Sequence, residues 1–145
     1  MVLAEALSRN GQGQLYTIDA NEHWLDVAQK GFPDRLRERV RFIHSPLEAV
    51  EHAGEVCSRF TKVPDAAPDF LYLDGPAPGD VPGWPQGKAV CAADPVLLES
   101  RFAPGFCMVV DGRTENVAFL KRQLRRNYAV RHNDMFKLPT FQLQS

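Results

Sequence analysis

Three apolar stretches of the chain each end at an aspartate. They are Leu15–Asp19, Phe70–Asp74 and Cys107–Asp111. Short continuous apolar runs of this kind are typical of buried strands in a parallel sheet. Ligands of open α/β sheets bind beyond the carboxyl ends of the strands, so we expect Asp19, Asp74 and Asp111 to converge on one crevice.

Between these runs, the hydrophobic pattern switches to helical spacing. Helices are predicted over residues 2–10, 21–32, 46–60, 90–102 and 114–128, with Asn21, Ser45 and Thr114 as caps. Further strands are predicted over 40–44 and, as a terminal antiparallel pair around Asn133-Asp134, over 128–132 and 140–143. The alternation of strands and helices predicts an α/β fold whose sheet is mostly parallel and ends in an antiparallel hairpin.

A segment rich in proline and glycine, residues 75–85, follows the strand that ends at Asp74. Such a composition cannot continue a helix or a strand, and a long loop at the carboxyl end of a strand is usually functional. We expect this loop to border the crevice. Its Trp84 is interpreted either as a hydrophobic plug or as a platform for a substrate.

Length and charge limit the class of protein. A chain of 145 residues with 44% hydrophobic content predicts one domain, residues 1–145. Seventeen basic and eighteen acidic side chains give a net charge of −1, which offers no general attraction to nucleic acid or to an anionic membrane. No apolar run approaches the roughly 18 residues of a membrane span, and no leader is evident, so a cytoplasmic protein is expected.

The three cysteines, Cys57, Cys91 and Cys107, lack any CxxC spacing. Each falls inside an apolar pattern, where cysteine packs as a small hydrophobic residue. Reduced, structural thiols are therefore expected.

Four motifs, in order, give the chain a family resemblance. They are Tyr16-Thr17-Ile18-Asp19, Phe42-Ile43-His44-Ser45, Pro68-Asp69-Phe70-Leu71-Tyr72-Leu73-Asp74-Gly75 and Ala103-Pro104-Gly105-Phe106-Cys107-Met108-Val109-Val110-Asp111. Over nearly its whole length the chain resembles the class I S-adenosylmethionine-dependent methyltransferases, from their first helix onward. The small-molecule O-methyltransferase branch is the most similar. The resemblance implies a Rossmann-like methyltransferase sheet and SN2 methyl transfer to a hydroxyl group of a small molecule.

The resemblance also implies a site for the cofactor S-adenosylmethionine. Its residues would be Asp19, Ala20, Asn21, His44, Ser45, Asp74 and Gly75. Asp19 would bind both ribose hydroxyls, and the adenine would lie beside His44. A carboxylate suits a ribose diol because it accepts two charge-assisted hydrogen bonds. The alternative interpretation is that Asp19 only caps the helix that begins near Asn21.

Asp74 and Asp111 are the candidates for catalysis and for a metal site. Hard cations such as Mg²⁺ or Ca²⁺ prefer carboxylate oxygens, and a bound metal lowers the pKa of a substrate hydroxyl. Metal-dependent relatives often place a third ligand where this chain has Gly112. Unless Asn116 or Asp80 completes the set, two carboxylates predict weak metal binding. The alternative is a non-metal site or a simple turn role for Asp111.

Among the other polar residues, Arg113 either clamps an anionic substrate group or pairs with a neighbouring carboxylate. His44 is the one histidine expected at the carboxyl end of a strand, where it is either structural or makes a cofactor or catalytic contact.

The first strand and glycine-rich turn of the resembled family have no counterpart in the sequence. We therefore expect an N-terminally truncated form with weak or lost cofactor binding. The missing strand lies at the middle of the family's sheet, and a sheet without it exposes ladder groups, which predicts a homodimer. Two alternatives are a degenerate, non-catalytic oligomeric binding module and a nucleotide-binding Rossmann oxidoreductase fragment.

Overall fold

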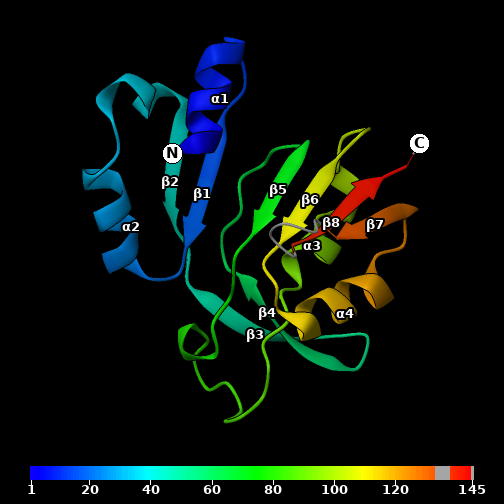
Figure 1. Ribbon diagram of the computed structural model, residues 1–145. Helices are drawn as coiled ribbons and strands as arrows, with labels where there is room; N and C mark the ends of the chain where they lie inside the picture. Colours follow the sequence, from blue (N-terminus) through cyan, green and yellow to red (C-terminus); the bar gives the residue numbers. More distant parts are fainter. Residues whose placement is uncertain (133–137, 145) are drawn as a thin grey trace. The chain divides into compact units, whose positions relative to one another are not determined.

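The structure of the protein is a computed structural model that describes residues 1–132 and 138–144 (Figure 1). The turn expected at Asn133-Asp134 lies outside the described residues. The fold is mixed α/β with small sheets. The chain divides into two compact units: unit 1 is Met1–Leu47 with Phe60–Pro64, and unit 2 is Glu48–Arg59 with Asp65–Ser145. A single domain stays a prediction, and each unit is described by itself.

Unit 1 is built around two parallel strands. In chain order its elements are α1 (Val2–Asn10), β1 (Leu15–Asp19), α2 (Glu22–Lys30), the 3₁₀ helix η1 (Asp34–Arg39) and β2 (Val40–His44). The register of β1 and β2 runs from Leu15 opposite Val40 to Asp19 opposite His44. Its buried core consists of Ala4, Leu36 and Val40, against which Leu15, Phe32 and Phe42 pack. Both predicted strands and the first helix are confirmed.

The ends of the two helices of unit 1 have local causes. Helix α1 stops at Gly11, whose φ of 71° is the left-handed conformation that glycine adopts at little cost. Helix α2 begins because the side chain of Asn21 accepts hydrogen bonds from the amides of His23 and Trp24, so the predicted cap is confirmed. The predicted apolar face of this helix is partly wrong, because Trp24 is 60% exposed.

A β-hairpin replaces the helix predicted over 46–60, so that prediction is wrong. Its strands are β3 (Leu47–His52) and β4 (Glu55–Phe60). The two residues between them, Ala53 and Gly54, both have positive φ, as a tight hairpin turn requires. A two-residue connection joins only antiparallel strands, so β3 and β4 run antiparallel. The length of this turn also sets which of their residues lie opposite each other. Ser45 caps no helix.

Unit 2 contains a four-stranded sheet. Its strands are β5 (Phe70–Leu73), β6 (Cys107–Val110), β7 (Tyr128–His132) and β8 (Pro139–Leu143), in the spatial order β5-β6-β8-β7. Strands β5 and β6 are parallel, whereas β8 runs antiparallel to both β6 and β7. The predicted terminal antiparallel pair is therefore confirmed.

The helices of unit 2 are shorter than predicted. They are η2 (Pro78–Asp80), α3 (Asp94–Leu97), η3 (Glu99–Arg101) and α4 (Thr114–Gln123). The helix predicted over 90–102 cannot begin at Val90, because Ala92 lies in a parallel bridge with Ser58, which keeps the chain extended there. The prediction that Thr114 caps α4 is wrong: the cap position is Arg113, and the Thr114 hydroxyl donates to the Glu115 carboxylate.

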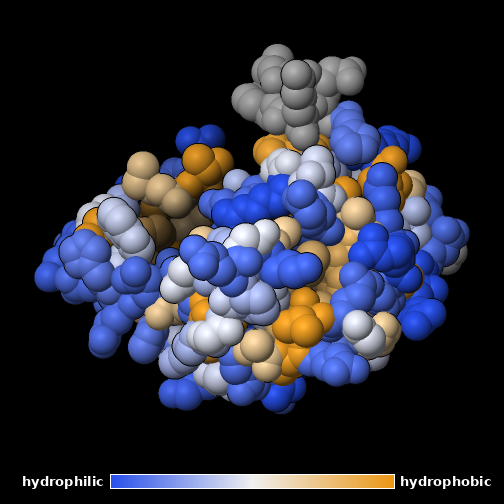
Figure 2. Space-filling view, turned by 90° about the horizontal axis from the view of Figure 1, so that it is seen from below, coloured by the Kyte–Doolittle hydropathy of each residue, from blue (hydrophilic) through white to orange (hydrophobic). Residues whose placement is uncertain are grey.

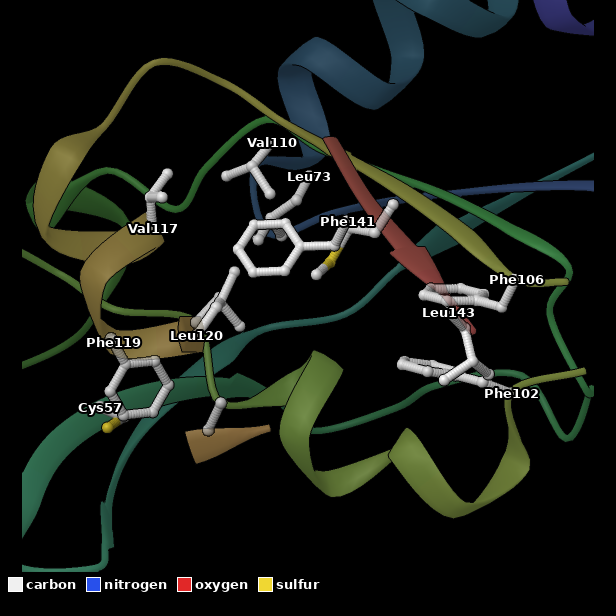
Figure 3. Close-up of a cluster of buried hydrophobic side chains, with 13 residues drawn as sticks. Cys57, Leu73, Phe102, Phe106, Val110, Val117, Phe119, Leu120, Phe141 and Leu143 are labelled. Carbon is white, nitrogen blue, oxygen red and sulfur yellow. The ribbon is translucent and has the colours of Figure 1, made fainter. Parts of the chain in front are cut away.

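The core of unit 2 lies among these elements (Figure 3). It is aromatic and aliphatic, and its fully buried members include Phe106, Phe119, Phe141, Met108 and Val110. The rings of Phe102 and Phe106 stack with their centroids 3.8 Å apart. This packing fixes β6, whose last residue directly precedes Asp111.

The surface is largely hydrophilic on the face shown in Figure 2, where hydrophobic residues lie in several separate areas. Within residues 1–132 and 138–144, none of the helices has the length and apolar character that crossing a membrane requires.

Candidate functional site

The residues predicted to form the site fall into two groups, one in each unit. The unit 1 group is Asp19, Ala20, Asn21, His44 and Ser45, and the unit 2 group is Asp74, Gly75 and Asp111. Their convergence on one crevice stays a prediction, and the two groups are treated in turn.

In unit 1, the ends of β1 and β2 bring Asp19 and His44 side by side. They are opposite each other in the parallel register, and the amide of Ser45 continues the ladder by donating to the Asp19 carbonyl at 3.0 Å. Oδ1 of Asp19 accepts from the amide of Asn21 at 2.7 Å. Asp19 thus supports the turn into α2, while Asn21 caps the helix. A carboxylate oxygen has two lone pairs, so this turn leaves acceptor capacity on Asp19.

His44 is oriented by the backbone. Its Nε2 lies 3.1 Å from the carbonyl oxygen of Ala20. Because a carbonyl only accepts, Nε2 carries a proton, and in the neutral ring Nδ1 is an acceptor. The imidazole therefore presents a hydrogen-bond acceptor next to the carboxyl end of β1.

A hollow of about 470 Å³ adjoins this group. It is lined by Glu22, His23, Leu25, Asp26, Gln29 and His44. Helix α2 supplies most of the lining, from Glu22 to Gln29, and β2 supplies His44. Its volume is within the range of about 300–1,000 Å³ that is typical of sites for small molecules.

Ser45 connects the end of β2 to the segment that contains Lys62. Its side chain is fully buried, and its Oγ accepts from the amide of Lys62 at 2.7 Å. This bond holds the Phe60–Pro64 segment against the end of β2. The hydroxyl faces the protein's own backbone.

In unit 2, the parallel register places Asp74 and Asp111 next to each other. Leu73 is opposite Val110, and the amide of Asp111 donates to the Leu73 carbonyl at 2.9 Å. Both carboxylates therefore lie at the carboxyl ends of β5 and β6, as the sequence predicts. Asp74 is exposed, whereas the side chain of Asp111 is only 16% exposed.

Asp111 is the electrostatically unusual group of this pair. Burial raises the pKa of its carboxyl group, the Arg113 guanidinium opposes the rise, and the charge of Asp74 adds to it. Its Oδ2 forms an ion pair with Nε of Arg113 at 2.8 Å. Its Oδ1 is buried, and the described part of the chain supplies no hydrogen-bond partner for it. An orphaned carboxylate oxygen next to a second carboxylate is suited to hold a proton.

Arg113 and Gly75 shape the turn beside the two carboxylates. Of the two interpretations of Arg113, the structure shows the pairing with a neighbouring carboxylate. The guanidinium also donates to the carbonyl of Pro76. Gly75 has a φ of 146°, a conformation that residues with a side chain rarely adopt. A glycine is therefore required directly after Asp74.

Asn116 fixes the same turn from α4. This residue is fully buried; its Oδ1 accepts from the amide of Ala92 at 3.1 Å, and its Nδ2 donates to the Gly75 carbonyl at 3.4 Å. Both ends of the side-chain amide are thus used to hold the protein's own backbone. Asp80 accepts from the amide of Ala77 through Oδ2 and caps its own short turn.

No third carboxylate, histidine or cysteine joins Asp74 and Asp111 in a metal-binding arrangement within the described ranges. Weak binding of Mg²⁺ or Ca²⁺ at Asp74 and Asp111 therefore stays a prediction.

Tyr72 is a neighbour of the carboxylates that sequence reasoning missed. It lies on β5 two residues before Asp74, which directly follows the end of that strand, and the period of two would point both side chains to the same side. Burial raises the pKa of its phenol, and the charges of Asp74 and Asp111 raise it further. The period of two along the strand was the signal that would have found it.

The chain was compared with protein-family models, with curated proteins and with solved structures, and none of the three comparisons finds a match.

Proposed function

We propose that the chain is an S-adenosylmethionine-dependent methyltransferase-like domain whose reaction is methyl transfer to a hydroxyl group of a small molecule. One observation carries the proposal: the paired carboxylates Asp74 and Asp111 at the carboxyl ends of adjacent parallel strands, with a buried oxygen that lacks a partner among the described residues. The terminal antiparallel hairpin agrees with the sheet that the resemblance implies. A Rossmann-like methyltransferase sheet is part of the proposal.

The residues of unit 1 suit a nucleoside. Asp19 keeps acceptor capacity for a ribose diol, His44 offers Nδ1 as an acceptor, and the adjoining hollow has the volume of a small-molecule site. S-adenosylmethionine, when bound, supplies an electrophilic methyl group on a sulfonium. The chain's own contribution there is to hold the nucleoside half.

The carboxylates of unit 2 would handle the proton. A hydroxyl that attacks a methyl group must lose its proton, and a carboxylate with a raised pKa is a better base than an ordinary one. Asp111 meets this condition because burial raises its pKa, and exposed Asp74 would position the hydroxyl. Arg113 would hold Asp111 in orientation through the ion pair.

Titration calorimetry with S-adenosylhomocysteine tests the proposal. Asp19→Asn preserves the acceptor for the Asn21 amide but removes the charge, so we expect a loss of affinity on the order of tens-fold, about 2–3 kcal/mol. Asp34→Asn is the matched control, because that carboxylate is 95% exposed and pairs with Arg37 along η1. Equal affinities of wild type and Asp19→Asn would contradict the assignment.

A non-catalytic binding module is the second candidate. The observation that favours it is that Asp111 already forms an ion pair with Arg113, as in a purely structural pair. This candidate predicts that neither S-adenosylhomocysteine nor S-adenosylmethionine binds to wild type or to any variant.

A further inference from the structure

Two of the three free cysteines lie beside each other in unit 2. Cys57 is on β4, and Cys91 lies just before α3. Ser58 and Ala92 form a parallel bridge, with the amide of Ser58 donating to the Cys91 carbonyl at 2.9 Å and the amide of Ala93 to the Ser58 carbonyl at 2.8 Å. In parallel register, Cys57 is therefore opposite Cys91.

This register satisfies the geometry of a disulfide. Neighbouring strands are about 4.7–4.9 Å apart, and residues opposite each other in a parallel pair point to the same side. Disulfides need a Cα separation of about 4.4–6.8 Å. Cys107 is on β6 and has no such relation to either residue.

The surroundings of the two thiols decide how they would react. Cys57 is fully buried and its Sγ contacts the Glu55 carbonyl, whereas Cys91 is partly exposed and its Sγ contacts the Glu115 carbonyl. Burial raises the pKa of Cys57 to about 11, with a contribution from the charge of Cys91. Burial also raises the pKa of Cys91. Both groups are thus thiols near neutral pH, and a partly exposed Cys91 would meet an oxidant first.

We propose that Cys57 and Cys91 are a redox pair that closes into an intramolecular disulfide on exposure to a peroxide. The Cys91 sulfur attacks one oxygen of hydrogen peroxide: the S–O bond of a sulfenic acid forms, the O–O bond breaks, and the other oxygen leaves as water with the thiol proton. The Cys57 sulfur then attacks the Cys91 sulfur; the S–S bond forms, the S–O bond breaks, and water leaves with the Cys57 proton. The product links β4 covalently to the segment that leads into α3.

Mass spectrometry of the folded protein after treatment with hydrogen peroxide tests the pair. We expect the intact mass to fall by two hydrogen atoms, one thiol to remain titratable, and proteolysis without reductant to yield a peptide linking Cys57 to Cys91. A thiol reductant should reverse the change. Oxidation should also raise the midpoint of thermal unfolding, because a cross-link restricts the unfolded chain.

Variants separate this pair from other pairings. Cys107→Ser should form the same bond, whereas Cys91→Ser should form none. A disulfide that contains Cys107, or peroxide treatment that leaves three titratable thiols in the wild-type protein, would overturn the proposal. The wild-type peptide map decides the matter even if a variant fails to fold.

Discussion

Asp111 gives the clearest pH prediction among single side chains. Because burial raises its pKa in the folded protein, the folded state binds its proton more tightly than the unfolded state does. Its contribution to stability is therefore fully present below the ordinary carboxyl pKa and is lost as the pH rises through the raised pKa. We expect the free energy of unfolding of wild type, relative to Asp111→Asn, to fall across this window and to level off above it.

Urea unfolding of both proteins from acidic to neutral pH measures this difference. Asp65→Asn, whose carboxylate is fully exposed beside Arg101, is the control and should show no such change with pH. A difference between wild type and Asp111→Asn that rises with pH would show that the ion pair with Arg113 dominates over burial.

The positions of these residues could be predicted from the sequence only as far as the pairing of the strands could. Asp74 and Asp111 each follow an apolar strand in the sequence, and parallel pairing of those strands is enough to make them neighbours. The role of Arg113 was open, because the choice between a substrate anion and Asp111 depends on side-chain packing. Asn116 was a candidate metal ligand for the same reason: its backbone partners, Ala92 and Gly75, are far from it in sequence.

Among the secondary-structure elements, the connection between α4 and β7 depends on one buried carboxylate. Glu99 is 7% exposed, and its side chain accepts hydrogen bonds from the amides of Arg125 and Arg126 at 2.9–3.0 Å. In return, the Arg126 guanidinium donates to the carbonyls of Glu99 and Phe102. We expect Glu99→Ala to lower the free energy of unfolding by about 2–3 kcal/mol, because two amides lose their acceptor.

Urea unfolding checks this prediction as well. Glu99→Gln keeps an acceptor oxygen and should cost less than Glu99→Ala, and Glu51→Ala, at an exposed position of β3, should be nearly neutral. If Glu99→Ala were as stable as Glu51→Ala, the carboxylate would not be holding the connection.

The hairpin β3–β4 shows why one element was missed. Leu47, Val50, Cys57 and Phe60 fit helical spacing, yet most of β3 alternates between partly buried and exposed side chains, whereas β4 buries Cys57 and Ser58 in succession. The turn at Ala53-Gly54 decides between the two patterns, since glycine tolerates positive φ and interrupts a helix. The helix over 46–60 was predicted from the spacing of apolar residues alone, and the effect of Gly54 on that helix was not considered.

For the chain as a whole, the oligomeric state is still a prediction, and we propose that the protein is a homodimer. In the described residues, β5 pairs on one side only, with β6, and Phe70 and Tyr72 on it are 39% and 47% exposed. An exposed strand edge with aromatic side chains is a template for pairing with another chain. Size-exclusion chromatography with light scattering should give twice the mass of the chain at micromolar concentration.

A charge on that edge should disrupt the dimer. We expect Phe70→Lys to elute as a monomer, because a lysine on an edge strand opposes pairing. Leu97→Lys is the matched control: Leu97 is 46% exposed but lies on α3, so the dimer should persist. Wild type that elutes as a monomer with a cooperative thermal transition would refute the prediction.

The individual strands and the terminal antiparallel pair were predictable, because they follow from apolar runs and their spacing. Which strands pair in parallel was not predicted, because that choice depends on how the chain packs as a whole. The separation into two units was not predicted, because composition and length say how much core a chain can form and not how many cores it forms.

The side chain of Asn116 also governs how the long loop after β5 moves. The side-chain amide of Asn116 holds the Gly75 carbonyl and the Ala92 amide, which are the two ends of the segment 75–92 that contains this loop. When the Asn116 side chain lets go, both ends are released together. The segment should therefore open as one cooperative unit and not residue by residue from its ends. Native-state hydrogen exchange would register this as a shared opening free energy for amides between Gly79 and Cys91. In Asn116→Ala that shared value should split, with the amides nearest each end exchanging fastest.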